Sequence, residues 1–301
     1  MYLHAMLNLT PTLHPSSEVE TEPNSSSCEK QPRGRTEPSE LCLLSTSNLT
    51  LEIFTGVTLW LDILSCASTG LGPCHSQLCI AALTEENSKV QLQDLMGCEN
   101  WAMLLIREIA ILKVSRDQAS SQQDQEDLQR RAADIEQRLE AGLRKTAKPY
   151  VELTEYSESA RTTEMSRQIE IKGITQFMAL AAFIYLHVSV HGSGPQSLPV
   201  AGELLFRWMF NIRFMTDSRV VPYLLWPICI AGCMATTPLQ EQVFRDIVAD
   251  AVADGKSSDT WLYVLQVMEL CWKMRRTEGK DSEGWDWERA MRVQGRIVLL
   301  V

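Results

Sequence analysis

The stretch VVPYLLWPICIAGCMA, residues 220–235, contains two prolines and the cysteines Cys229 and Cys233 but no charged residue. Three kinds of structure would suit such a stretch. It could span a membrane, form a metal or redox site, or be a buried helix in a globular core. The choice among them decides the fold, because each places these residues in different surroundings.

The stretch is too short for a typical membrane span. Residues 220–235 number 16, whereas a transmembrane helix needs about 20 apolar residues. The other apolar run, residues 174–190, is also short and is interrupted by Gln176, His187 and Ser189. Both runs lie among amphipathic segments that need an apolar surface to pack on. We therefore expect no membrane span.

The candidate metal ligands form incomplete motifs. Cys229 and Cys233 would share one helix face, but a structural zinc site needs four ligands, and these two cysteines supply only half of them. His187 and His191 have the same spacing, yet Val188 follows the first histidine where a metalloprotease helix has its glutamate. We expect core packing for both cysteines and no catalytic, cofactor-binding or metal-ligating residue. The alternative is a helical metal-dependent enzyme that uses His187 and His191.

The bulk composition is that of a globular protein with a substantial core. The chain has 301 residues, 45% of them hydrophobic, and a net charge of −10. With this net negative charge, the chain as a whole lacks the excess of basic residues that is typical of nucleic-acid-binding proteins. Nine scattered cysteines indicate reduced thiols more than a disulfide framework. Residues 173–236 form an apolar centre that carries only Glu203, Arg207, Arg213, Asp217 and Arg219 as charged residues.

Apolar residues recur at three- and four-residue steps in the first half of the chain, as in amphipathic helices. Residues 51–68 are expected to form a helix that ends at Gly70 and Gly72. Residues 98–113 form another, and residues 122–145 form a charged helix with one apolar stripe. The expected inward faces are Phe54, Val57, Trp60, Leu61 and Leu64; Trp101, Leu104, Leu105, Ile109 and Leu112; and Leu128, Ala132, Ile135, Leu139 and Leu143.

The second half of the chain has the same periodicity. Residues 159–190 predict a long helix or a kinked pair that closes at Gly192. Residues 203–211 are expected to be buried around nearly their whole circumference, because only Glu203, Arg207 and Asn211 interrupt the apolar surface.

Residues 237–240, TPLQ, have the pattern of a capping box with proline at the first helical position. We expect a helix to begin there, followed by helices at residues 260–274 and 287–300. The expected inner face of the capped helix is Leu239, Val243, Phe244, Ile247, Val248 and Ala251.

The chain is therefore expected to be all-α, a multi-helix globular domain with buried apolar central helices. Residues 15–45 are rich in proline, serine and glutamate, a composition that buries too little surface to fold. We expect residues 1–48 to be mostly disordered or variable and residues 49–301 to form the helical domain.

Five stretches together resemble a known family. They are WLDILSCASTGLGPC (60–74), DLMGCENWAMLLIREIAIL (94–112), WPICIAGCMATT (226–237), LYVLQVMELCWKMRR (262–276) and DWERAMRVQGRIVLLV (286–301). In this order they are similar to the fungal-specific transcription factor regulatory domain, an all-helical region that follows a binuclear zinc-cluster DNA-binding domain in many fungal regulators. The resemblance implies that W-P-x-x-I-A-G-C is a buried helix start, with Trp226 as anchor, Pro227 in the first turn and Gly232 allowing close helix approach.

The resemblance also implies a function. It predicts a nuclear, non-enzymatic regulator of RNA polymerase II transcription, whose partners are the transcription machinery or co-regulator proteins, with a homodimer as one assembly and no membrane. The family's zinc cluster uses C-x₂-C-x₆-C halves, and no C-x₂-C occurs in this sequence. Zinc is therefore expected only in that family module. We expect this chain to contact DNA indirectly or through a module outside this sequence.

Overall fold

The computed structural model describes residues 40–72, 78–84, 88–154, 162–194, 198–212, 221–253, 258–277 and 285–300. The chain divides into two compact units, Met1–Leu43 and Leu44–Val301. Residues 1–39, most of the segment expected to be disordered, lie outside the described residues. The first described helix begins at Glu40, before Leu49, where the helical domain was expected to start.

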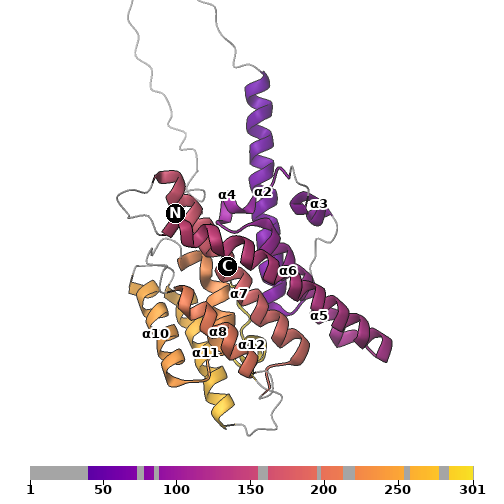
Figure 1. Cartoon of the computed structure of the whole chain (residues 1–301), viewed down its shortest axis with the longest axis vertical. Coiled ribbons are helices and arrows are strands. Elements are labelled where there is room, and N and C mark those ends of the chain that lie inside the picture. Colours follow the sequence, from indigo (N-terminus) through magenta and orange to yellow (C-terminus); the bar gives the residue numbers. More distant parts are fainter. Residues whose placement is uncertain are drawn as a thin grey trace, which may run out of the picture. The chain divides into compact units, whose positions relative to one another are not determined.

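Within the described ranges every regular element is a helix, and no strand is present, so the expected all-α fold is confirmed. In chain order the elements are α2 (Glu40–Thr69), α3 (Leu78–Thr84), α4 (Leu92–Met96), α5 (Asn100–Gln118), α6 (Gln122–Thr154), α7 (Thr163–His191), α8 (Leu198–Ile212), the 3₁₀ helix η2 (Val221–Leu224), α9 (Leu225–Cys233), α10 (Pro238–Ala253), α11 (Ser258–Thr277) and α12 (Trp287–Val293) (Figure 1).

Helix α7 is the central element of the larger unit. It packs against α5, α6, α8 and α9, and every residue from 173 to 186 is buried. The Thr162 side chain accepts a hydrogen bond from the backbone N–H of Met165 at the start, and Gly192 ends the helix with a φ of 78°. Glycine adopts a positive φ without the steric cost that a Cβ atom would bring. The long helix expected at residues 159–190 is confirmed from Thr163 onward, whereas residues 159–161 lie outside the described residues.

Among the described residues, two helical stretches are long and apolar enough to cross a membrane by length and composition, Leu49–Thr69 of α2 and Thr163–His191, which is α7. The apolar window of the second is 89% buried within the fold, as in the core helix of a soluble protein. That of the first is only 33% buried. The apolar runs weighed above as membrane spans were residues 174–190 and 220–235, and residues 49–69 were not among them. The absence of a membrane span therefore stays a prediction.

Helix α9 carries the WPICIAGC motif, and all nine of its residues are buried. Pro227 is the third residue of the helix, where a missing backbone N–H removes no intrahelical hydrogen bond. A Cβ atom on Gly232 would collide with Met268 of α11 and lie 3.0 Å from the Phe244 ring of α10. The expected buried helix start and the close helix approach at Gly232 are therefore both confirmed.

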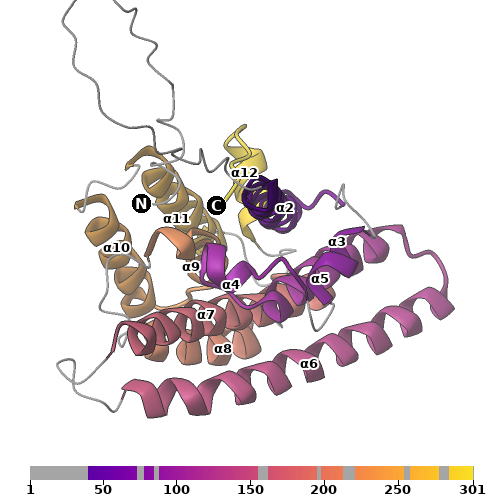
Figure 2. The same cartoon turned by 90° about the horizontal axis from the view of Figure 1, so that it is seen from above.

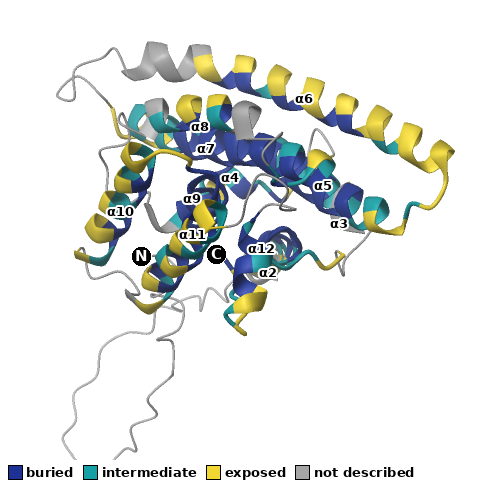
Figure 3. Ribbon diagram, turned by 90° about the horizontal axis from the view of Figure 1, so that it is seen from below, coloured by how far each residue is buried: buried dark blue, intermediate teal, exposed yellow. Residues whose placement is uncertain are grey.

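Helix α6 runs along α7 and α5 and has one buried stripe (Figures 2 and 3). Its other positions are mostly exposed polar side chains, as expected for residues 122–145. The stripe consists of Ala132, Ile135, Leu139 and Leu143, with Leu128 partly buried beside it.

The capping box at the start of α10 is present as expected. The backbone N–H of Thr237 donates to Gln240 Oε1 at 3.1 Å, and the backbone N–H of Gln240 donates to Thr237 Oγ1 at 3.3 Å. Pro238 is the first helical residue. Two of the orphan N–H groups at this helix start are thus satisfied by local sequence alone.

Four large apolar residues that were expected to face the core are exposed instead. Phe54 is 67% exposed and Leu61 38%, because α2 turns Leu59, Ile63 and Ala67 inward beside the expected Trp60 and Leu64. Phe206 is 67% exposed, so the expected burial of residues 203–211 around their circumference is wrong. Leu239, in the first turn of α10 beside the exposed cap, is 74% exposed. The inward faces expected for α5 and for the rest of α10 are at least partly buried.

Candidate functional site

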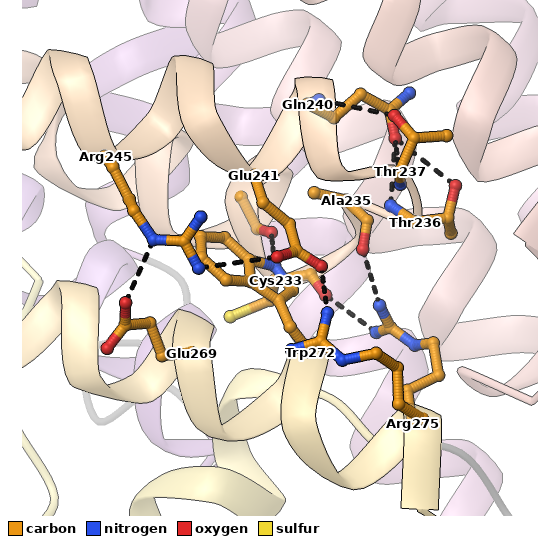
Figure 4. A network of polar contacts seen from close by, with 12 residues as sticks. Cys233, Ala235, Thr236, Thr237, Gln240, Glu241, Arg245, Glu269, Trp272 and Arg275 are labelled. Atoms are coloured by element: carbon orange, nitrogen blue, oxygen red, sulfur yellow. Dashed lines mark hydrogen bonds and ion pairs between the residues drawn. The ribbon is translucent and has the colours of Figure 1, made fainter.

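The C-terminal end of α9 is fixed by two side chains of α11, Trp272 and Arg275, which we call the carbonyl clamp (Figure 4). Trp272 Nε1 donates to the Gly232 carbonyl at 2.8 Å. The Arg275 guanidinium donates to three more carbonyls, those of Cys233 at 2.7 Å, Ala235 at 2.9 Å and Trp285 at 3.0 Å. Four carbonyl oxygens from two separate segments are therefore held by one helix.

The carbonyl clamp supplies hydrogen-bond donors to backbone carbonyls at the buried end of α9. The last carbonyls of a helix have no intrahelical partner, and α9 ends where water has little access. A guanidinium has several N–H donors in a fixed plane, so one arginine can serve several carbonyls at once. Burial lowers the pKa of Arg275, which is the direction expected for a cation taken out of water.

A buried carboxylate on α10 joins the clamp to its surroundings. Glu241 accepts hydrogen bonds from Arg276 of α11 and, at 3.4 Å, from Arg245 one turn further along α10. Arg245 also donates to Glu269 at 3.1 Å, and its guanidinium lies 4.8 Å from the ring centroid of Trp272. These contacts join α10 to α11 close to the end of α9. The network therefore fixes the position of α10 relative to α11.

Cys229 and Cys233 are fully buried, as expected, and a third buried thiol, Cys271, lies near Cys233. Cys271 Sγ donates to the Asp286 carbonyl at 3.3 Å. Burial raises the pKa of Cys233 and of Cys271 well above the ordinary value. Because the thiolate is the reactive and metal-binding form, these protonated thiols are suited to packing.

His187 and His191 lie together in the last turns of α7, with ring centroids 4.9 Å apart. His187 is half-buried and His191 is exposed. Across the described ranges no group of three or more histidine, cysteine, aspartate or glutamate side chains is placed to hold a metal ion. The pair expected for the enzyme alternative is thus brought together, but the described part of the chain supplies no third ligand.

A second buried polar contact was not anticipated from the sequence. Lys113 of α5 pairs with Glu288 of α12, and both residues are buried. Burial raises the pKa of Glu288, and the neighbouring Lys113 opposes that rise. The pair lies beside an aromatic cluster in which Tyr185 meets Trp226 and Trp287 edge-on, at centroid distances of 6.0 and 5.6 Å.

Neither Lys113 nor Glu288 could be singled out by spacing, because the two residues are 175 positions apart. The same holds for the clamp, where Arg275 and the carbonyl of Cys233 are 42 positions apart. In the sequence, Arg275 stood out only as part of WKMRR, the end of the family-like stretch 262–276. That position does not reveal which carbonyl groups Arg275 contacts.

The arrangement brings carbonyls, guanidinium groups and protonated thiols together in a buried place, and this set fixes helices in position. The described part of the chain is a helical domain with an apolar centre, buried polar contacts between helices and a charged outer helix.

The chain belongs to the fungal-specific transcription factor domain family, whose model matches residues 1–301. It is 30% identical over 83% of its length to the trichothecene biosynthesis transcription regulator TRI10 of Trichoderma arundinaceum, of which it covers 54%. It is 30% identical, again over 83% of its length, to the transcription factor dibT of Pestalotiopsis microspora, of which it covers 41%. A third relative, the ustiloxin B cluster transcription factor ustR of Aspergillus flavus, is 24% identical over 83% of the chain and is covered to 42%.

The family expected from the five ordered stretches is therefore confirmed. The chain spans about half the length, or less, of these curated relatives. No solved structure matches it.

Proposed function

We propose that the chain is the regulatory, protein-interaction part of a nuclear transcription regulator that acts on RNA polymerase II genes. The observation that carries this proposal is the family match over residues 1–301. It is supported by relatives that are named as regulators of trichothecene biosynthesis and of the ustiloxin B cluster. We further propose that the controlled genes are a biosynthetic gene set.

The proposed route to DNA is indirect. The sequence contains no C-x₂-C pair for the family's zinc cluster and has a net charge of −10. Affinity for DNA comes largely from cations that neutralise phosphates. The proposed partners are therefore the transcription machinery or co-regulator proteins, with a homodimer as one assembly. DNA contact belongs to a partner or to a module outside this sequence.

Tethering tests the regulatory role. The chain is fused to an unrelated DNA-binding domain, and transcription of a reporter with the matching site is compared with that from the DNA-binding domain alone. We expect a change of several-fold, lost in a Trp226→Ala fusion because that variant disrupts the core, and retained in a Gly202→Ala fusion. Unchanged transcription from a folded, nuclear fusion would contradict the proposal.

The target genes are tested in the native fungus. Deletion of the gene should change the transcripts of a biosynthetic gene set, which transcript sequencing measures. A transcriptome without such a change would remove the proposed targets and leave the result of the tethering experiment standing. A gel-shift assay with the isolated chain should show no sequence-selective duplex binding.

A further inference from the structure

Exposed apolar side chains gather in two segments of the larger unit. Eleven large apolar side chains are exposed among the described residues, and seven of the eleven lie in these two segments. We call the two sets the α2 stripe, which is Leu49, Leu51, Phe54 and Leu61, and the α12 patch, which is Val293, Ile297 and Leu299. Apolar surface that is concentrated in this way marks an interaction site more often than scattered exposed residues do.

The α2 stripe lies on a part of the helix that the rest of the fold covers poorly. Leu51, Phe54 and Leu61 are three and seven residues apart, so they form one line along the helix. Leu51 is 66% exposed and Phe54 67%. Between residues 49 and 58 only Gly56 is buried. This line of apolar side chains is therefore open to a partner.

The two segments carry charges of opposite sign. Helix α2 contains three acidic residues and no lysine or arginine. Beside the α12 patch, Arg292 and Arg296 are exposed. Glu288, the acidic residue of α12, is buried in its pair with Lys113. The surface around the α12 patch is therefore basic, and it complements the acidic helix that carries the α2 stripe.

The fold places the α12 patch near the last turn of α2. A Cβ atom on Gly70, directly after α2, would lie 2.7 Å from a carboxylate oxygen of Glu288, so α12 lies beside this end of the helix (Figure 2). A two-fold axis that crosses α2 near its middle runs the two copies of the helix in opposite directions. It carries the first half of one α2 to the Gly70 end of the other, and thus to its α12. The same contact then forms twice, as in any two-fold dimer.

We propose that the partner for these surfaces is a second copy of the chain. In this dimer the α2 stripe of each copy packs on the α12 patch of the other, and acidic and basic surfaces meet. Pairing of α2 with α2 would instead bring two acidic helices together. The dimer specifies the homodimer proposed above and rests on that part of the proposed function. Its formation is measured on the purified chain, so its failure would leave the result of the tethering experiment standing.

Sedimentation velocity of the purified full chain tests the dimer and its apolar contacts. We expect a monomer–dimer equilibrium at concentrations up to about 100 µM. Phe54→Ser and Ile297→Ser should each weaken the dimer by at least about tenfold, because both side chains become buried in it. Leu239→Ser removes an equally exposed apolar side chain on α10 and should dimerise as the parent does. Circular dichroism checks that each variant is folded.

A pair of charge reversals tests which surfaces meet. Glu52→Lys and Arg296→Glu should each weaken the dimer by about fivefold or more, since each change places like charges in both contacts. An equimolar mixture of the two variants should restore dimerisation, because both contacts of the mixed dimer then join opposite charges. A parent chain that stays monomeric, parent-like dimerisation of Arg296→Glu, or a mixture no tighter than the single variants would each overturn the proposal.

Discussion

Helices α9 and α6 are both regular, but they are helical for opposite reasons. Helix α9 has nine residues, all buried, and includes a proline, a glycine and a β-branched pair, Ile228 and Ile230. Isolated helices of that length are marginal in water, so its surroundings must hold it. Helix α6 has 33 residues rich in glutamine, glutamate, arginine and alanine, which are good helix formers, and it buries one stripe.

The difference teaches where stability resides in this fold. In α9 every residue is buried, and the carbonyls of Gly232 and Cys233 accept hydrogen bonds from side chains of α11, so a single change should be felt across the core. In α6 most side chains contact water and their neighbours one turn away. Substitutions should therefore be costly in α9 and its clamp, and mild on the outer face of α6.

The largest effect is expected from Trp226→Ala. Trp226 is 1% exposed and packs edge-on against Tyr185 with a centroid distance of 6.0 Å. Truncating a buried tryptophan should lower the free energy of unfolding by about 3–5 kcal/mol. Denaturant titration measures it. The control is Phe206→Ala, a large but exposed apolar residue, expected within about 0.5 kcal/mol of the parent. Similar losses in both variants would refute the contrast.

The carbonyl clamp should be nearly as sensitive. Arg275→Met keeps much of the side-chain volume but removes all the donors to the carbonyls of Cys233, Ala235 and Trp285. A buried carbonyl left without a partner costs about 1–3 kcal/mol, so a total loss of about 3 kcal/mol is expected by the same titration. Arg130→Met on α6 is the matched exposed change and should cost less than about 0.5 kcal/mol. A near-neutral Arg275→Met would show that the clamp holds nothing.

Alanine substitutions at two glycines should change the stability of the chain in opposite directions. A Cβ at Gly232 would collide with Met268 and lie 3.0 Å from Phe244, so Gly232→Ala should destabilise by about 1–3 kcal/mol. A Cβ at Gly202 of α8 would meet no described atom within 4 Å. Gly202→Ala should therefore stabilise the chain by about 0.5–1 kcal/mol, because alanine favours the helix. Melting temperatures should move in opposite directions, and a shared direction would contradict the packing at Gly232.

The smallest effect is expected on α6. Arg138 donates to both carboxylate oxygens of Glu108 on α5, at 2.6 and 2.8 Å, and is nearly half exposed. Arg138→Gln should cost only about 0–1 kcal/mol, and less at high salt, since the pair is open to solvent. If Arg138→Gln lowered the free energy of unfolding by more than about 2 kcal/mol, and still did so in 1 M salt, α6 would be as sensitive to substitution as α9. That result would contradict the contrast between the two helices.

Local features were predictable from the sequence because they depend on neighbouring residues. The capping box of Thr237 and Gln240 forms from four consecutive residues, and the stop of α7 needs only Gly192. The burial of α9 also followed, since residues 220–235 hold no charge and are too short for a membrane span.

The rest depends on which distant segments meet. The periodicity of apolar residues shows which face of a helix is apolar, but it does not show how much of that face another helix will cover. Phe54 and Leu239 lie on parts of such faces that remain exposed. A cation in the last turn of a helix is ordinarily solvated, so Arg275 gave no sign that it would serve carbonyls up to 42 positions away. Buried ion pairs such as that of Lys113 and Glu288 follow from tertiary packing alone.

The central claim is that the WPICIAGC helix is packed core and not a reactive or metal-binding site. Thiol alkylation tests it most directly, with labelling of Cys229 and Cys233 measured by peptide mass spectrometry with and without denaturant. Because both thiols are fully buried, and burial raises the pKa of Cys233, labelling should be slow in the native chain and should rise only as the chain unfolds. Rapid labelling of both cysteines in the native chain would contradict the account.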